Sequence, residues 1–217
     1  MASSNASSSS RSAPGLSLTA IHQSGHFIGY LNNKKKANQI PILWNLKLDG
    51  HRWPETVSNS DPTIVEFKTN STPETLTIRD MITGVDVIDH LYREIKYLLS
   101  GYAAEWIYLQ QYDDDVQRLR YLEDKYRREV EGFAPHEDLL RAVRLSWNHW
   151  ITSDQSLLHL NPIFKDAVLD LKSFWHEVTR VARLLDEHRE LDHQQMAAIM
   201  STLDPALQPP YRVWSSL

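Results

Sequence analysis

The residues best suited to chemistry in this chain are histidines and carboxylates, because it contains ten His and no Cys. The lack of Cys removes thiolate nucleophiles, disulfides and cysteine-type zinc sites. Two histidine pairs lie close in the sequence: His22 with His26, next to a Ser-rich arm, and His188 with His193, across an expected helix break. Chance placement among ten histidines accounts for both pairs. We therefore predict no metal site and no cofactor.

Two further motifs resemble metal sites and fail on spacing. His176-Glu177 begins like the zinc-protease helix H-E-x-x-H, but the second His of that motif is replaced by Arg180. The run Asp113-Asp114-Asp115 lacks the spacing and the glycine of a calcium loop. We expect these carboxylates to favour the positive N-terminal end of the following helix instead.

Motifs for phosphate binding and nucleophilic catalysis are also missing. The seven glycines form neither G-x-G-x-x-G nor a P-loop, and no G-x-S-x-G elbow occurs. A Ser, His and Asp set can still assemble in space, since triads are defined by geometry, but no residue is indicated. We predict no catalytic residue.

Charge is distributed unevenly along the chain. The net charge is −5, yet the first 48 residues contain five basic residues and no acidic one, which leaves −10 for the remainder. An acidic body repels phosphates, which bind through Lys and Arg. Arginines and aromatic rings do alternate in Tyr121 to Arg128, although acidic neighbours make ion pairs along a helix the simpler interpretation.

The element expected to organise the fold is an amphipathic helix from Thr77 to Leu99, preceded by a strand at Thr63 to Thr69. Apolar residues at Ile88, Tyr92 and Ile95 continue its three-four rhythm, which is typical of a helix with one buried face. Ser100-Gly101 indicates a break or kink after it.

Alternating patterns predict further strands. His26 to Leu31 is expected to be a first strand or a docking segment, and the alternation covers Ile42 to Leu48 and Leu139 to Ile151, with a polar connection at Asn32 to Gln39. Asp49-Gly50 is suited to a tight hairpin turn after the second of these strands.

Helix signals follow in the second half of the chain. They indicate a helix from Val116 to Glu131 ended by Gly132, a long helix opened by Asn161-Pro162 and running to about Glu190, and a short one capped by Asp192. The predicted fold class is therefore α+β, with a small antiparallel sheet packed against several α-helices.

The predicted organisation has four parts. Residues 1–19 form a disordered Ser-rich arm, 20–153 an α+β core domain, 154–204 C-terminal helices packed on that core, and 205–217 an extended Pro-rich and aromatic tail. No apolar run of membrane-spanning length occurs, so we expect no membrane contact. We expect an intracellular protein of the cytoplasm or nucleus, with organelle targeting through the acid-free arm as an alternative.

The order of these elements resembles a domain of unknown function found widely in basidiomycete fungi. The matching pieces are Trp44-Asn45-Leu46 for its W-D-L strand, Thr63 to Thr69, Leu76 to Ile82 for its helix start, and Leu139 to Ser153 for its closing strand. The resemblance covers roughly residues 40 to 153, with Asn45 in place of the usual acid. It implies a fold and no active site.

A second segment is similar to another class of protein. Leu99 to Trp106 (LSGYAAEW) looks like a helical segment in the nucleoproteins of segmented negative-strand viruses, which bind RNA in a basic cleft. That resemblance implies RNA binding.

The sequence favours a non-enzymatic interaction or scaffold protein with an unidentified protein partner. Its expected contact residues lie in the aromatic tail, namely Tyr211, Val213, Trp214 and Leu217. The first alternative is an RNA-binding or coat-like nucleoprotein, and an enzyme without a visible motif is the second. The phosphate contacts of the RNA alternative are Lys34, Lys35, Lys36, Arg127, Arg128, Arg141 and Arg144.

Overall fold

The protein is mostly helical, with one small antiparallel sheet. The computed structural model describes residues 15–36, 46–47, 84–110, 114–134, 137–150 and 155–208. Its helices are α1 (Leu18–Lys36), α4 (Gly84–Tyr108), α5 (Asp115–Val130), α6 (Asp138–Trp150), α7 (Ser156–Ser173), α8 (Trp175–His188) and α9 (His193–Thr202). The strands are β1 (Leu46–Lys47) and β2 (Glu190–Leu191).

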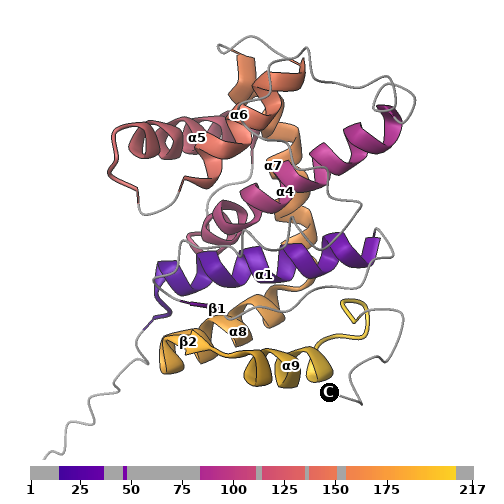
Figure 1. Ribbon diagram of the computed structural model, residues 1–217. Helices are drawn as coiled ribbons and strands as arrows, with labels where there is room; N and C mark the ends of the chain where they lie inside the picture. Colours follow the sequence, from indigo (N-terminus) through magenta and orange to yellow (C-terminus); the bar gives the residue numbers. More distant parts are fainter. Residues whose placement is uncertain are drawn as a thin grey trace, which may run out of the picture.

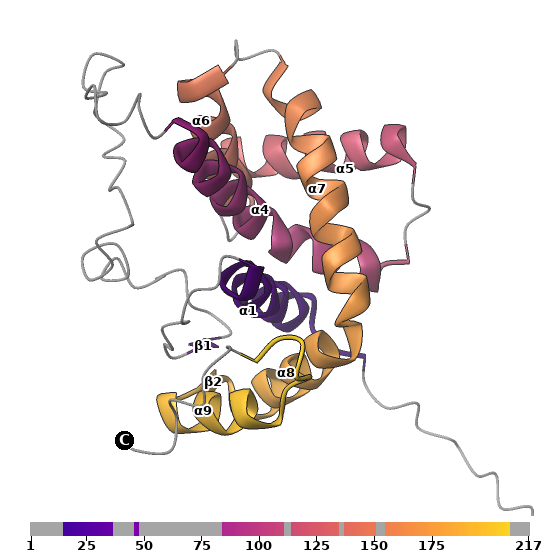
Figure 2. The ribbon, with the colours of Figure 1, turned by 90° about the vertical axis from the view of Figure 1, so that its right-hand side faces the viewer.

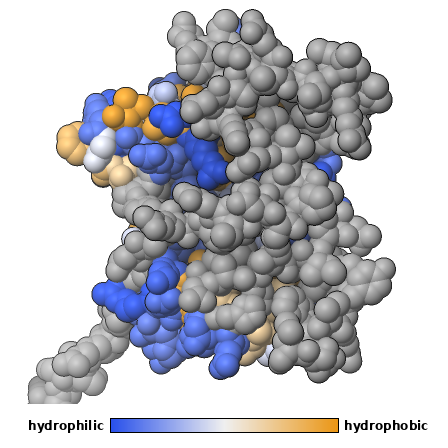
Figure 3. All heavy atoms as spheres, in the orientation of Figure 1, coloured by the Kyte–Doolittle hydropathy of each residue, from blue (hydrophilic) through white to orange (hydrophobic). Residues whose placement is uncertain are grey.

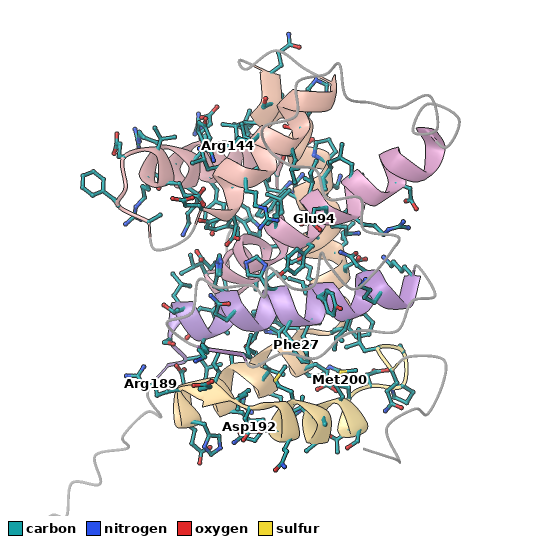
Figure 4. The ribbon with its side chains drawn as sticks, in the orientation of Figure 1. Phe27, Glu94, Arg144, Arg189, Asp192 and Met200 are labelled. Carbon is teal, nitrogen blue, oxygen red and sulfur yellow. The ribbon has the colours of Figure 1, made fainter. Side chains whose placement is uncertain are left out.

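Helix α1 lies at the centre of this arrangement. It packs against α4 on one side and α8 on the other, and α7 contacts both α1 and α4 (Figure 1). Figure 2 shows α1 almost end-on between these two layers, with α7 running beside them. Phe27 on α1 and Met200 on α9 lie in the layer between their helices, and both are buried (Figure 4). Burying apolar side chains on both sides of one helix gives the fold a continuous core.

Helix α4 buries the stripe that its sequence predicts. Ile95 and Leu99 are fully buried, and Tyr92 packs partly against the core. The predicted break at Ser100-Gly101 is wrong, because α4 continues to Tyr108. The stripe also continues, through the buried rings of Tyr102 and Trp106.

The predicted strand at His26 to Leu31 is wrong, because these residues belong to α1. The predicted connection at Asn32 to Gln39 is likewise helical as far as Lys36. Ile21, Ile28 and Leu31 are buried at a spacing that fits one face of a helix. A Cβ atom at Gly25 would lie 2.5 Å from the Cβ atom of Ala104, so Gly25 permits the close approach of α1 to α4.

The predicted strand at Leu139 to Ile151 is helix α6 as far as Trp150. Leu139, Ala142, Val143 and Ser146 are buried, and this three-four spacing fits a helix with one face on the core. The closing strand implied by the fungal resemblance is therefore absent from Asp138 to Trp150.

The predicted start at Asn161-Pro162 is wrong, because α7 begins at Ser156 and contains Pro162. The helix predicted to reach about Glu190 is also interrupted at Phe174, between α7 and α8. Local end signals elsewhere are confirmed. Asp114 caps α5, and Asp192 forms a capping box with Gln195 at the start of α9.

The sheet consists of β1 paired antiparallel with β2, with Leu46 opposite Leu191. Both leucines are buried, so this short ladder closes over the core next to α8. The predicted strand at Thr63 to Thr69 and the rest of Ile42 to Leu48 lie outside the described residues.

Candidate metal centre

Two histidines and one aspartate converge between α1 and α6. His22 and His26 are four residues apart on α1, so their side chains share a face of the helix. Their Nε2 atoms are 3.0 Å apart, and each lies 3.2 Å from Oδ2 of Asp138, the first residue of α6. Both imidazoles are buried, and the side chain of Asp138 is 13% exposed. The three atoms therefore form a nearly equilateral triangle inside the protein.

The other nitrogen of each imidazole is bound on the far side of the ring. Nδ1 of His22 lies 2.6 Å from Oε1 of Glu105, and Nδ1 of His26 lies 3.1 Å from the backbone oxygen of Tyr97. A carboxylate and a carbonyl only accept hydrogen bonds, so we assign the Nδ1 proton to each ring. In the neutral tautomers, both Nε2 lone pairs then point at the triangle, together with the lone pairs of Asp138.

The charge around this triangle attracts a cation. Burial alone lowers the pKa of His22, but Asp138 and Glu105 outweigh burial and raise it to about 9. Burial likewise opposes ionisation of Asp138, yet the two histidines hold the pKa of that carboxyl well below its usual range. The three facing atoms are two imidazole nitrogens and one oxygen of an ionised carboxylate. Their lone pairs require a positive species between them, either a proton or a metal ion.

Gly101 lets α4 approach the two imidazoles closely. A Cβ atom at this position would lie 2.5 Å from Nε2 of His26 and 2.6 Å from Nε2 of His22. Real Cβ atoms do not approach nitrogens so closely, so only glycine fits without displacing the rings. The absence of a side chain on α4 therefore lets the α4 backbone lie directly against both rings.

The triangle has the size of one face of a metal coordination shell. Bonds of about 2.0 to 2.1 Å to a tetrahedral zinc ion place neighbouring ligand atoms about 3.3 Å apart. The observed separations are 3.0 and 3.2 Å. Imidazole nitrogen and carboxylate oxygen are ligands of Zn²⁺ and of other first-row divalent ions. Within the described part of the chain, these three residues are the group whose ligand atoms lie close enough together to hold an ion.

A second layer of hydrogen bonds supports the three residues. Glu105 also accepts hydrogen bonds from Tyr121 at 3.0 Å and from Lys125, both on α5. Burial raises the pKa of a carboxyl such as Glu105, but His22 and Lys125 lower it to about 2, so the group stays ionised. Carboxylates that orient the Nδ1 proton of a metal-binding histidine are a common feature of metal sites.

Another buried carboxylate, Glu129, fixes the start of α6. Its oxygens accept hydrogen bonds from the backbone amides of Leu139 at 3.1 Å and Leu140 at 2.6 Å, and the hydroxyl of Tyr102 also donates to it. These bonds satisfy amides that are left without partners at a helix start. They place Asp138 next to α1.

The predicted phosphate contacts lie on three helices. Lys34, Lys35 and Lys36 are in the last turn of α1, Arg127 and Arg128 in that of α5, and Arg141 and Arg144 on α6. Arg144 is exposed on α6 (Figure 4). Carboxylates already pair with Lys36 (Asp170, 2.8 Å), Arg127 (Asp124, 2.7 Å) and Arg141 (Glu94, 3.6 Å). The RNA alternative stays a prediction.

The predicted tail contacts Tyr211, Val213, Trp214 and Leu217 lie outside the described residues. The scaffold interpretation that rests on them also stays a prediction.

Sequence reasoning did not find the centre. It treated His22 and His26 as a chance pair and assigned a strand from His26 onward. The available signal was their separation of four, which places two imidazoles on one face only if the segment is helical. Asp138 is 116 residues from His22, so no local pattern connects them.

Comparisons with known proteins add no assignment. A scan against protein-family models, a search of curated proteins and a search of solved structures each found no match. Within the described residues, every helix is too short or too polar to span a lipid bilayer.

Proposed function

We propose that this protein binds one divalent transition-metal ion of the zinc class through His22, His26 and Asp138. The observation that carries the proposal is the triangle of Nε2, Nε2 and Oδ2 atoms, at 3.0 and 3.2 Å, with both Nδ1 atoms bound elsewhere. A divalent cation satisfies all three lone pairs at once, whereas a single proton satisfies one pair of atoms.

Such an ion links α1 to α6. Two ligands come from α1 and one from α6, and second-layer contacts come from α4. Three protein ligands leave a further coordination position for water or for a bound group. Of the three ligand side chains, that of Asp138 is the only one with more than 1% exposure. The ion therefore exchanges with solvent past Asp138.

The proposal is tested by metal content and by cobalt spectroscopy on the full chain. We expect one zinc ion per chain by mass spectrometry of the elements, and the visible absorption of four-coordinate Co²⁺ after exchange. Asp138→Asn keeps the shape of the side chain and removes its charge, so it should weaken zinc binding at least tenfold.

The matched control is His159→Gln, which removes an exposed histidine on α7. This variant should bind zinc as the natural chain does. Absence of bound zinc, together with no cobalt spectrum and no effect of either ion on unfolding, would show that the cluster holds only protons, and would overturn the proposal.

A further inference from the structure

A pocket of about 150 Å³ lies near the proposed metal centre. It is formed where the start of α1 meets α4, the end of α5 and the residues after α5, at the left in Figure 1. The lining residues are Leu18, Thr19, Tyr102, Glu105, Lys125, Arg128, Phe133 and Ala134. None of the three proposed metal ligands is among them, so this pocket is a separate site.

The charged residues of the pocket favour an anion. Two cations, Lys125 and Arg128, face one carboxylate, Glu105. That carboxylate is already bound by Tyr121, Lys125 and His22, so its charge is largely compensated. The pocket wall is therefore cationic, although the whole chain has a net charge of −5.

Hydrogen-bond donors remain available in this wall. The Arg128 guanidinium has no hydrogen bond or ion pair with any described residue, and the side chain is exposed. The Lys125 ammonium binds Glu105 and lies 5.3 Å and 5.2 Å from the ring centres of Tyr102 and Tyr121. A guanidinium and an ammonium side by side are the donors that recognise a carboxylate or a phosphate.

The opposite wall is apolar. Leu18 and Ala134 line it, and Phe133 is 73% exposed. The backbone amides of Phe133 and Ala134 both donate to the backbone oxygen of Arg128, at 2.8 and 3.2 Å, so these residues are fixed at the end of α5. Figure 3 shows hydrophobic residues among hydrophilic ones on the upper left, where α5 lies. An exposed ring beside the Arg128 guanidinium and the Lys125 ammonium indicates a ligand with one charged end and one apolar end.

We propose that this pocket binds a small organic acid. Its carboxylate accepts hydrogen bonds from Arg128 and Lys125, and its apolar body lies against Phe133 and Leu18. The pocket has the volume of about five water molecules at about 30 Å³ each, which suits an acid with a single ring. Glu105 lies between the pocket and His22, so the acid does not contact the metal-binding nitrogens.

The test is a titration of the full chain with benzoate at constant ionic strength, followed by calorimetry or by chemical shifts. We expect saturable binding at one site in the millimolar range or tighter. Arg128→Gln should weaken it about tenfold, because a charged hydrogen bond is lost. The matched control is Arg127→Gln on the same helix turn, since Arg127 pairs with Asp124 and does not line the pocket.

A second variant tests the apolar wall. Phe133→Ala removes an exposed ring, so the chain should fold normally, and it should weaken benzoate several-fold while leaving acetate unchanged. The proposal is overturned if benzoate shows no saturable binding, or if the Arg127 and Arg128 variants weaken it equally. Inorganic phosphate binding as tightly as benzoate would also overturn it, because the site would then recognise any oxyanion.

Discussion

Gly101 is the residue on which the metal centre depends most directly. Its missing side chain lets α4 pack against both rings, because a Cβ atom there would lie within 2.6 Å of both Nε2 atoms. Gly101→Ala improves helix propensity by about 1 kcal/mol. Its methyl group nevertheless clashes with both imidazoles and displaces the proposed ligand atoms from their present positions. We therefore expect normal helix content by circular dichroism and a zinc affinity at least tenfold lower.

A Gly101→Ala chain that binds zinc as tightly as the natural chain would contradict this role. A loss of helix content would instead show that the close contact of α1 with α4 is what fails. The two outcomes are separated by measuring circular dichroism and zinc affinity on the same sample.

Glu105 acts on the ion through His22 and does not touch it. Glu105→Gln keeps an oxygen that can accept from Nδ1 but removes the charge that makes His22 a stronger ligand. Loss of such a partner lowers metal affinity about 10- to 100-fold, which a competition assay with a chelator measures. Glu123→Gln, an exposed change on α5, is the control and should have no effect.

The sequence shows the two histidines but not the contacts that bring them together with Asp138. Their separation of four is visible, and so is the identity of Gly101. The need for a glycine at that position arises only once α1 packs against α4. Asp138 joins them from 116 residues away, a contact that a single sequence does not reveal.

At the scale of elements, the start of α6 depends on Glu129. Its carboxylate accepts from the amides of Leu139 and Leu140, and a Gln side chain offers one oxygen where the carboxylate offers two. Glu129→Gln should lower the free energy of unfolding by about 1 to 3 kcal/mol, the cost of a buried unsatisfied donor. Urea denaturation measures this loss.

The exposed neighbour Glu131 provides the control for that experiment, since Glu131→Gln changes the same charge without touching α6. Equal stability of the two variants would show that Glu129 does not hold the start of α6. Zinc affinity of the Glu129 variant should also fall, because Asp138 is the first residue of the helix that Glu129 caps.

Elements with strong local signals were predicted correctly, and elements decided by packing were not. Helices α5 and α9 follow from Asp114, Gly132 and Asp192, whose side chains or backbone freedom act within one turn. Helix α6 was predicted as a strand because its apolar residues satisfy an alternating pattern over a short stretch, and part of α1 was predicted as a strand or docking segment. The helical spacing of their apolar residues is visible only when the buried residues are known.

At the scale of the whole molecule, a bound ion stabilises the fold by mass action. Zinc at about a hundred times its dissociation constant adds about 2.7 kcal/mol to the free energy of unfolding. For a chain of this size, that corresponds to a rise in melting temperature of roughly 5 to 10 °C. We expect a chelator to reverse this rise in the natural chain.

The Asp138→Asn variant should show no such dependence on zinc, because one ligand is missing. A melting temperature that rises with zinc equally in both chains would indicate binding elsewhere. Scanning calorimetry with and without the chelator decides between the two results.

The overall architecture was predictable only in outline. The amphipathic helix α4, its buried stripe and a strand at Leu46–Lys47 follow from the sequence, whereas the partner strand at Glu190–Leu191 was predicted as the end of a helix. The position of α1 against α4 did not follow from the sequence, because this tight contact depends on Gly25 and Gly101. Small residues at such contacts carry little periodic signal.

The order of the proposed ligands along the chain determines when the site can be completed during synthesis on the ribosome. His22 and His26 leave the exit tunnel long before Asp138, which is made 116 residues after His22. At about 5 to 20 residues per second, this delay is on the order of ten seconds. During that interval the nascent chain carries two imidazoles without their acid, so the ion is captured in full only when α6 has been made.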